Sequence, residues 1–184
     1  MPAVAASSLV IRPARPDDAP RFAAIYGHHV RTGVATFETE VPDDVEMARR
    51  LHDLTARGFP WLAAERDGEL IGYAYAGPFR PRAAYAHAVE DSIYLDPRAT
   101  GRGTGTALLE ALVAAAAAAG FRQMIAVIGD SANLASIAVH ARCGFAPAGT
   151  LRAVGFKLER WVDTVHMQRA LGEGDRSPPG DRGA

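Results

Sequence analysis

The stretch that decides the fold is DPRATGRGTGTALLEALVAAAAAAG, residues 96–120. Three alternate glycines lead into a run of residues from Thr104 to Ala119 that favour a helix, and Gly120 ends this run. A glycine loop that enters a helix presents unpaired backbone N–H groups and the positive end of the helix dipole, which together bind phosphate oxygens. The same glycines are also compatible with a simple flexible turn. The glycines are Gly101, Gly103 and Gly105.

Two common phosphate-binding motifs do not fit these glycines. A P-loop places Lys directly after its last glycine, where this chain has Thr106. The dinucleotide-binding fingerprint has another glycine spacing, and no acidic residue about 20 positions later ends a following strand. The loop therefore does not predict an NTPase or a dinucleotide-binding enzyme, and a different phosphate-bearing ligand is expected.

Apolar runs on both sides of this stretch predict seven strands. Asp67 and Gly68 join two of the runs and predict a tight hairpin. One strand directly precedes the glycine loop and another follows its helix, so these two strands form the one parallel pair expected in the sheet. The expected strands occupy residues 8–14, 59–66, 69–77, 87–97, 121–129, 150–156 and 161–171.

Helical spacing and capping residues predict four helices. Asp17 is expected to cap the first helix, and Asp43 forms a capping box with Glu46 at the second. Asp130 and Ser131 are the expected caps of the fourth. The fold class is therefore α+β, a mixed and mostly antiparallel seven-stranded sheet flanked by about four helices. The expected helices occupy residues 17–33, 43–58, 104–119 and 130–142.

Composition limits the classes of protein that fit. The chain of 184 residues suits one domain, expected at 9–170, with disordered ends at 1–8 and 171–184. A net charge of -1 offers no basic surface for nucleic acid or an anionic membrane, so the expected partner is a small molecule. Cys143 is the only cysteine, and the first residues lack a secretory signal pattern. We therefore expect a cytoplasmic protein.

Two segments together resemble one enzyme family. Gly103 and Gly105 match the motif Q/R-x-x-G-x-G/A, with Thr100 in place of its first residue. SANLASIAVHARCGF, residues 131–145, contains an Asn that starts a helix and a Gly-Phe pair that follows it. Both segments resemble the Gcn5-related N-acetyltransferase (GNAT) family, which has an acyl-CoA N-acyltransferase fold. Within it, the chain over 9–170 is most similar to phosphinothricin and methionine sulfoximine or sulfone N-acetyltransferases, through VATFETE, PWLAAE, GYAYAGPFRPRAAY, VEDSIYL, AVIGDSANLASIAVH and GTLRAVGFKLERWVD.

The resemblance implies that acetyl-CoA is the acetyl donor. Because Thr100 replaces the Gln or Arg of the motif, one pyrophosphate contact is expected to be lost or to pass to Arg98 or Arg102. Relatives are usually homodimers, so a homodimer is expected. The residues that the resemblance assigns to acetyl-CoA are Ile93, Tyr94, Leu95, Gly101, Arg102, Gly103, Thr104, Gly105, Thr106 and Asn133.

Direct acetyl transfer to an amine requires a base, stabilisation of a tetrahedral oxyanion and a proton for the departing thiolate. Glu90 matches the family's proposed catalytic glutamate, whereas Asp91 lies on the opposite face of the strand. The backbone N–H of Ile93 or Tyr94 is the oxyanion donor that the resemblance implies. His140 stands where many relatives carry a Tyr, and it is expected to be the general acid or a packed structural residue.

The acceptor site is expected near the loop between the third and fourth strands. Arg80 and Arg82 could bind the acid group of an amino-acid analogue, with Phe37 as a wall and Glu90 beside the amine. Solvated arginines and a packed Phe are the alternatives. Cys143 lies at the C-terminal end of a helix, where the dipole disfavours a thiolate, so no acyl-enzyme is expected.

Two other functions remain compatible with the sequence. One is acetylation of a protein N-terminus or a polyamine, although Arg80 and Arg82 would repel a polycation. The other is a non-catalytic acyl-CoA-binding sensor, although Glu90 and His140 argue for turnover. The six histidines show no metal-ligand spacing, so no metal is expected.

Overall fold

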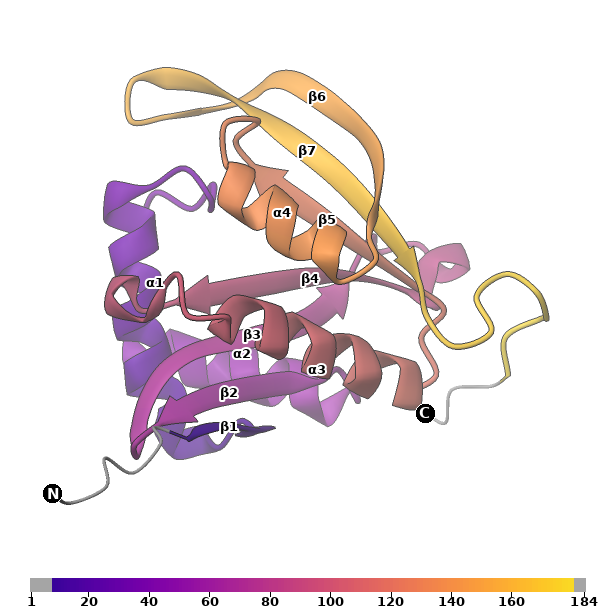
Figure 1. Ribbon diagram of the computed structural model, residues 1–184, viewed down its shortest axis with the longest axis horizontal. Helices are drawn as coiled ribbons and strands as arrows, with labels where there is room; N and C mark the ends of the chain where they lie inside the picture. The colour runs from indigo at the N-terminus through magenta and orange to yellow at the C-terminus, as the bar shows by residue number, and fades with distance from the viewer. Residues whose placement is uncertain (1–7, 181–184) are drawn as a thin grey trace, which may run out of the picture.

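Seven strands form one sheet (Figure 1). They are β1 (Leu9–Pro13), β2 (Trp61–Arg66), β3 (Glu69–Pro78), β4 (Ala88–Leu95), β5 (Gln123–Gly129), β6 (Ala146–Lys157) and β7 (Arg160–Ala170). Their order in the sheet is β1-β2-β3-β4-β5-β7-β6. All neighbours are antiparallel except β4 and β5, which are parallel, so the predicted mixed, mostly antiparallel sheet is confirmed.

The computed structural model describes residues 8–180. The disorder expected at residues 1–7 and 181–184 therefore falls outside the described residues. After β7 the chain continues through a series of turns, in which Leu171 is 1% exposed and belongs to the core. Arg122 Nη2 donates to the carbonyl of Ser177 at 2.7 Å. The packed part of the chain thus extends past residue 170.

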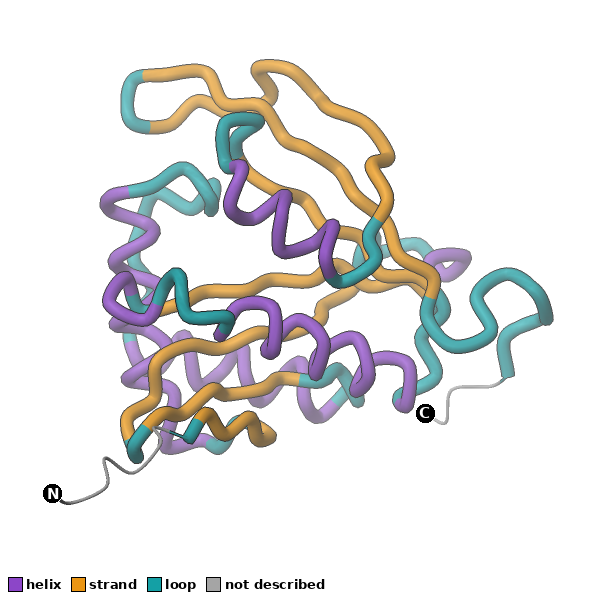
Figure 2. The backbone as a smooth tube through the Cα atoms, in the orientation of Figure 1, coloured by secondary structure: helices purple, strands orange, loops and turns teal. Residues whose placement is uncertain are grey.

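Helices cover both faces of the sheet (Figure 2). They are α1 (Ala19–Thr32), α2 (Asp44–Ala56), α3 (Thr104–Ala118) and α4 (Leu134–Arg142). On one face α1 and α2 bury an aromatic cluster, in which the Phe22 ring contacts those of Trp61 and Tyr73 with centroids 5.8 and 4.6 Å away. On the other face α3 and α4 bury the larger apolar core, which includes Leu108 and Met124. No helix in the described part of the chain is long and apolar enough to cross a membrane.

The predicted hairpin and the predicted start of α2 are confirmed. Asp67 and Gly68 have φ values of 53° and 79° between β2 and β3, as a turn of this kind requires. Asp43 Oδ1 accepts a hydrogen bond from the backbone N–H of Glu46 at 2.8 Å and so caps α2. The Glu46 carboxylate does not complete the capping box, because it binds Arg49 and Arg50 instead.

The predicted cap of the first helix is wrong. A short 3-10 turn, Pro16–Asp18, precedes α1, and Asp18 rather than Asp17 is the residue before the helix. Asp18 Oδ2 accepts from the backbone N–H of Arg15 at 2.7 Å and also binds the guanidinium of Arg12. These bonds hold Asp18 inside the turn, so the regular helix begins one residue later than expected.

The predicted caps of the fourth helix are also wrong. Asn133 caps α4, because its Oδ1 accepts from the backbone N–H of Ser136 at 3.2 Å. Asp130 Oδ1 accepts from the backbone of Ala132, and Ser131 Oγ donates to Asp163 on β7. Both expected caps are therefore engaged in the turn before the helix.

Candidate active site

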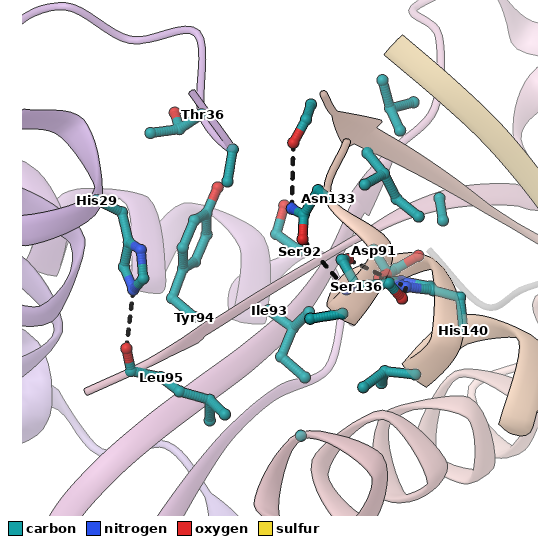
Figure 3. A pocket seen from close by; sticks show the side chains of 18 of the residues that line it. His29, Thr36, Asp91, Ser92, Ile93, Tyr94, Leu95, Asn133, Ser136 and His140 are labelled. Carbon is teal, nitrogen blue, oxygen red and sulfur yellow. Dashed lines mark hydrogen bonds and ion pairs between the residues drawn. The ribbon is translucent and has the colours of Figure 1, made fainter. Parts of the chain in front are cut away.

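The two parallel strands of the sheet pair over only half of β4. Their partners run from Ala88 with Gln123 to Asp91 with Ala126, and the strands separate beyond this point. A cavity of about 1110 Å³ lies there, lined by β4, β5, the start of α3, α4 and the loop after α1 (Figure 3). The second half of β4 therefore faces a cavity where a strand partner would otherwise lie.

Alternation along β4 decides which backbone groups face the cavity. Asp96 N donates to Ile71 O on β3 at 2.8 Å. Every second residue of a strand directs its backbone groups to the same side, so the N–H and C=O of Tyr94 also face β3. The N–H and C=O groups of Ile93 and Leu95 therefore point the other way, to the side that β5 has left. Of the two expected oxyanion donors, Ile93 N–H faces the cavity and Tyr94 N–H does not.

His29 on α1 lines the same cavity, and no motif or spacing in the sequence singles it out. Its Nε2 bonds to the carbonyl oxygen of Leu95 at 2.8 Å, so Nε2 carries the proton and donates it (Figure 3). Burial lowers the pKa of His29, against the opposing effect of this hydrogen bond. The neutral imidazole of His29 therefore donates a hydrogen bond to the carbonyl of Leu95, the last residue of β4.

The glycine loop has the conformation that only glycine adopts easily. Gly101 and Gly103 have φ values of 72° and 77°, in the left-handed region, and a Cβ on either would meet nothing within 4 Å. A Cβ on Gly105 would make an ordinary contact, 3.6 Å from Leu95 Cδ1. All three glycines line the cavity. The turn that needs glycine therefore also brings the N-terminus of α3 to the cavity.

The remaining residues assigned to acetyl-CoA divide into two groups. Thr106 and Asn133 line the cavity, together with the strand and loop residues described above. Arg102 and Thr104 are outside its lining. Thr104 is 1% exposed, and its Oγ1 accepts from Arg66 Nη2 at 3.2 Å on the β2 side. The side chain of Thr104 therefore fixes the start of α3 rather than facing the cavity.

Thr100, the residue that departs from the family motif, lines the cavity. Its Oγ1 donates to the carbonyl of Pro97 at 3.0 Å and so stabilises the loop. Arg98, one of the two arginines expected to replace the missing contact, is outside the cavity lining, and its guanidinium binds Asp96 at 2.9 Å and Glu69 at 2.9 Å. Of the two arginines expected at this place, the structure leaves only Arg102 without such an engagement among the described residues.

Glu90 lines the cavity at the point where β4 and β5 separate. Its side chain is half-buried and has no hydrogen-bond partner among the described residues. Burial raises its pKa, the neighbouring charge of Asp91 raises it further, and the charge of Arg80 lowers it. A carboxylate with a raised pKa and no protein partner is suited to accept a proton from a ligand.

Asp91 and His140 form a buried ion pair, and both residues line the cavity. His140 Nε2 lies 3.0 Å from Asp91 Oδ2, and the two side chains are 3% and 2% exposed. His140 Nδ1 donates to the carbonyl of Ser136 at 2.8 Å, so both ring nitrogens are engaged (Figure 3). Burial lowers the pKa of His140, but the hydrogen bond and charge of Asp91 outweigh it, and the net effect is a raised pKa. The pair joins β4 to α4.

Comparison with known proteins identifies the family. The model of the acetyltransferase (GNAT) family matches residues 22–145. The chain belongs to this family. It is 51% identical to a phosphinothricin N-acetyltransferase of Alcaligenes faecalis over 96% of the chain and 89% of that protein. It is 39% identical to an L-methionine sulfoximine/L-methionine sulfone acetyltransferase of Pseudomonas paraeruginosa, over 94% of the chain and 99% of that protein.

A solved structure supports the same assignment. The GNAT superfamily phosphinothricin acetyltransferase of Sinorhizobium meliloti, in complex with AcCoA, superposes with a TM-score of 0.91 and 48% identity. The match covers 94% of each chain. The predicted fold, family and enzyme class, an acetyl-CoA-dependent N-acetyltransferase, are thereby confirmed.

The residues expected at the acceptor end of this GNAT enzyme are not all in one place. Phe37 lines the cavity and is 42% exposed. Arg80 and Arg82 are outside the lining. Arg80 lies over the ring of Phe79, 4.6 Å from its centroid, and Arg82 is exposed at the start of a short 3-10 turn. Within the described chain, the two arginines therefore form no clamp around the cavity.

Cys143 and metal-binding groups are the remaining features to place relative to the cavity. Cys143 is 3% exposed, lies outside the main cavity lining, and its pKa is raised by burial. Neither its place nor its protonation suits a nucleophile. Among residues 8–180, no group of three or more His, Cys, Asp or Glu side chains is arranged to hold a metal ion.

Proposed function

We propose that this protein transfers the acetyl group of acetyl-CoA directly to the amino group of a small amino-acid analogue such as phosphinothricin, methionine sulfoximine or methionine sulfone. The observation that carries the proposal is Glu90, a half-buried carboxylate that faces the cavity where β4 and β5 separate. The names of the relatives at 51% and 39% identity support the class of acceptor. The free thiol of Cys143 supports a reducing, cytoplasmic location.

The residues of the cavity fit acetyl-CoA as the donor. Gly101 and Gly103 bring the free N–H groups at the start of α3 to the cavity, where they favour the charge of a pyrophosphate. The carbonyl of Ile93 and the N–H of Leu95 can pair with the amides of a pantetheine arm. Acetyl-CoA, when bound, supplies the thioester carbonyl that the amine attacks.

The proposed roles of the side chains follow from their surroundings. A free amino group is protonated at neutral pH, and Glu90 accepts the proton that it must lose before it attacks. The raised pKa of Glu90 makes it a better base than an exposed carboxylate. Ile93 N–H is the proposed donor to the oxyanion. When the tetrahedral intermediate collapses, the carbon–sulfur bond breaks, the nitrogen loses its second proton to solvent, and the CoA thiolate takes up the proton held by Glu90. Because Asp91 and Ser136 engage both nitrogens of His140, we assign His140 to holding α4 in place rather than to proton transfer.

Phe37 and Arg80 are the proposed acceptor-binding residues. Phe37 forms an apolar wall of the cavity. The charge of Arg80 reaches Glu90, so it can attract the acid group of an amino acid whose amine lies at Glu90. Arg82, on the same loop, is proposed as a second cation at the rim.

Free-thiol release from acetyl-CoA tests this function. Phosphinothricin, methionine sulfoximine, methionine sulfone, a polyamine and a peptide amine are assayed side by side. Turnover confined to the first three is the expected result. Turnover with only the peptide or the polyamine would keep the acetyl donor and reject the proposed acceptor. Binding of acetyl-CoA without thiol release from any amine would indicate a sensor.

A homodimer through the β6–β7 hairpin is also part of the proposal. β6 is an edge strand of the sheet, and an exposed apolar edge is a site of association. A two-fold dimer would cover the same side chains on both copies. The large apolar side chains exposed along this hairpin are Leu151 (52%), Val154 (51%), Phe156 (60%), Leu158 (53%) and Trp161 (68%).

Replacing Trp161 with Glu is expected to convert the dimer to a monomer, because each interface would then bury an unpaired carboxylate. Sedimentation velocity at low micromolar concentration measures the change. Val10→Glu is the matched control, since Val10 is 47% exposed on β1 at the opposite edge of the sheet. A monomeric wild type, or a Trp161→Glu variant that stays dimeric, would refute this interface.

A further inference from the structure

Lys157 is the only lysine of the sequence, and every other basic side chain among its 20 Lys and Arg residues is an arginine. It ends β6 and is 5% exposed, although lysines are seldom buried. Its Nζ donates to the carbonyl of Thr36 at 2.7 Å, across 121 positions of sequence. The tip of the β6–β7 hairpin therefore contacts the loop at 33–43, which follows α1 (Figure 1).

The surroundings of Lys157 are unfavourable for an ammonium group. Burial lowers its pKa, and the charge of Glu38 opposes this effect. The Glu38 carboxylate is itself bound to Arg50, at 2.7 Å. Burying an ammonium group costs desolvation energy, even when the group donates to a backbone carbonyl. The role of Lys157 is therefore to connect β6 to the 33–43 loop rather than to add stability. Without Nζ, the Thr36 carbonyl would lose this hydrogen bond in a buried position.

Two other polar contacts of this loop go to helices on its own side of the sheet. Thr36 Oγ1 lies 2.6 Å from the hydroxyl oxygen of Tyr26 on α1. Arg50, which binds Glu38, belongs to α2. Lys157 differs from both, because it joins the loop to β6 at the far edge of the sheet. It therefore spans the two sides of the opening between β4 and β5.

Phe37 follows Thr36 in the loop, and its ring lies on backbone that has no side chain. A Cβ on Gly155 would overlap Phe37 Cε2 and would lie 2.6 Å from Cζ and 2.9 Å from Cδ2. A Cβ on Gly129 would lie 3.3 Å from Phe37 Cε1. Gly155 precedes Lys157 by two residues on β6, so one short segment holds both the Thr36 carbonyl and the Phe37 ring.

We propose that Lys157 is a positioning residue that fixes the 33–43 loop as the wall of the acceptor site and thereby selects a small amino-acid analogue over a peptide amine. The selectivity part of this inference rests on the proposed function. Lys157 itself is outside the cavity lining, so it acts through Thr36 and Phe37, which line it. The loop blocks a peptide substrate from the acceptor end of the cavity only while Lys157 binds the Thr36 carbonyl and the Phe37 ring packs on Gly155.

The Lys157→Met variant tests the proposal, because Met keeps the length of the side chain and removes the donor. The expected result is a rise of about 10-fold in KM for the small acceptor, with KM for acetyl-CoA within about 2-fold of the wild type. The ratio of kcat/KM for phosphinothricin to that for a peptide amine should fall about 10-fold. Steady-state kinetics of both substrates measure all three quantities.

Arg160→Met is the matched control, since it removes one positive charge from the same hairpin. Arg160 is exposed and binds Asp130 at 2.7 Å, without contact to the loop. The KM values and the acceptor selectivity of the Arg160→Met variant should equal those of the wild type. Equal changes in both variants, or a Lys157→Met variant that lowers kcat and leaves the acceptor KM unchanged, would overturn the positioning role.

Two further measurements keep the test decisive. If Lys157→Met does not fold, Gly155→Ala displaces the Phe37 ring and should raise the acceptor KM in the same way; an unchanged acceptor KM would overturn the proposal. If the wild type acetylates no small acceptor, the proposed function fails by itself. The link to the loop is then judged by cleavage with a Glu-specific protease at Glu38 and Glu40, expected to be about 10-fold faster in Lys157→Met than in Arg160→Met. Equal cleavage rates would overturn the link.

Discussion

Replacing Glu90 with Gln is expected to lower kcat by about two to four orders of magnitude and to leave the affinity for acetyl-CoA nearly unchanged. Gln keeps the shape of the side chain but cannot accept a proton from the attacking amine. Glu38 and Asp91 also line the cavity, but they are paired with Arg50 and His140, whereas Glu90 has no such partner among the described residues. Thiol release at saturating concentrations of both substrates measures kcat, and calorimetric titration measures the binding of acetyl-CoA.

The pH dependence gives an independent check of this role. Burial and the charge of Asp91 raise the pKa of Glu90 above its ordinary value of 4.5. In the wild type, kcat/KM should therefore decline with falling pH through a pKa above 4.5, and Glu90→Gln should lose this decline. Glu110→Gln is the control, because Glu110 is exposed on α3 and outside the main cavity. An unchanged kcat in Glu90→Gln would remove Glu90 from the mechanism.

The features that sequence could predict are those set by neighbours in the chain. Asp67 and Gly68 form a hairpin because their own φ angles permit it, and Gly101 and Gly103 form the loop for the same reason. Alternation along β4 likewise placed Glu90 and Asp91 on opposite faces. These properties depend on a few consecutive residues, so the sequence predicts the glycine loop, the strand before it and the helix after it.

The features that sequence could not predict depend on residues that only the fold brings together. The sequence favours Glu90 over Asp91 as the base and gives no sign that Asp91 binds His140, which lies 49 positions away. Periodicity placed both residues on regular elements but gave no distance between the elements. The hydrogen bond from Lys157 to Thr36 joins residues that are 121 positions apart, and it connects the end of β6 to the loop after α1. No local pattern distinguishes a buried lysine from an exposed one.

The expected arginine clamp illustrates a different limit. Charge and loop position made Arg80 and Arg82 reasonable ligands for an acid group, but a loop sequence does not define the direction of long side chains. In the structure Arg80 lies over Phe79, and both arginines are outside the cavity lining. Their part in binding therefore remains a prediction, whereas the position of Phe37 in the cavity is established.

Replacing Asp91 with Ala is expected to lower the free energy of unfolding by about 3–5 kcal/mol, because His140 would remain buried without its partner. Both side chains are nearly inaccessible, so the imidazole would lose its charged partner in a buried position. Asp91→Asn should cost less, since its amide N–H can donate to Nε2 of a neutral His140. Urea denaturation near pH 6 measures these differences, and the Asp91→Ala/His140→Ala double variant should lose less than the sum of the single variants.

The pH dependence of stability distinguishes this ion pair from simple packing. The folded pKa of His140 is raised above its ordinary value of 6.5, so the folded protein binds more protons than the unfolded chain between these two values. The stabilisation is therefore fully present below about pH 6.5, and it is lost as pH rises through the folded pKa of His140. Asp91→Ala should lose this dependence. A variant within about 1 kcal/mol of the wild type, with the same pH profile, would show that packing alone holds α4 against β4.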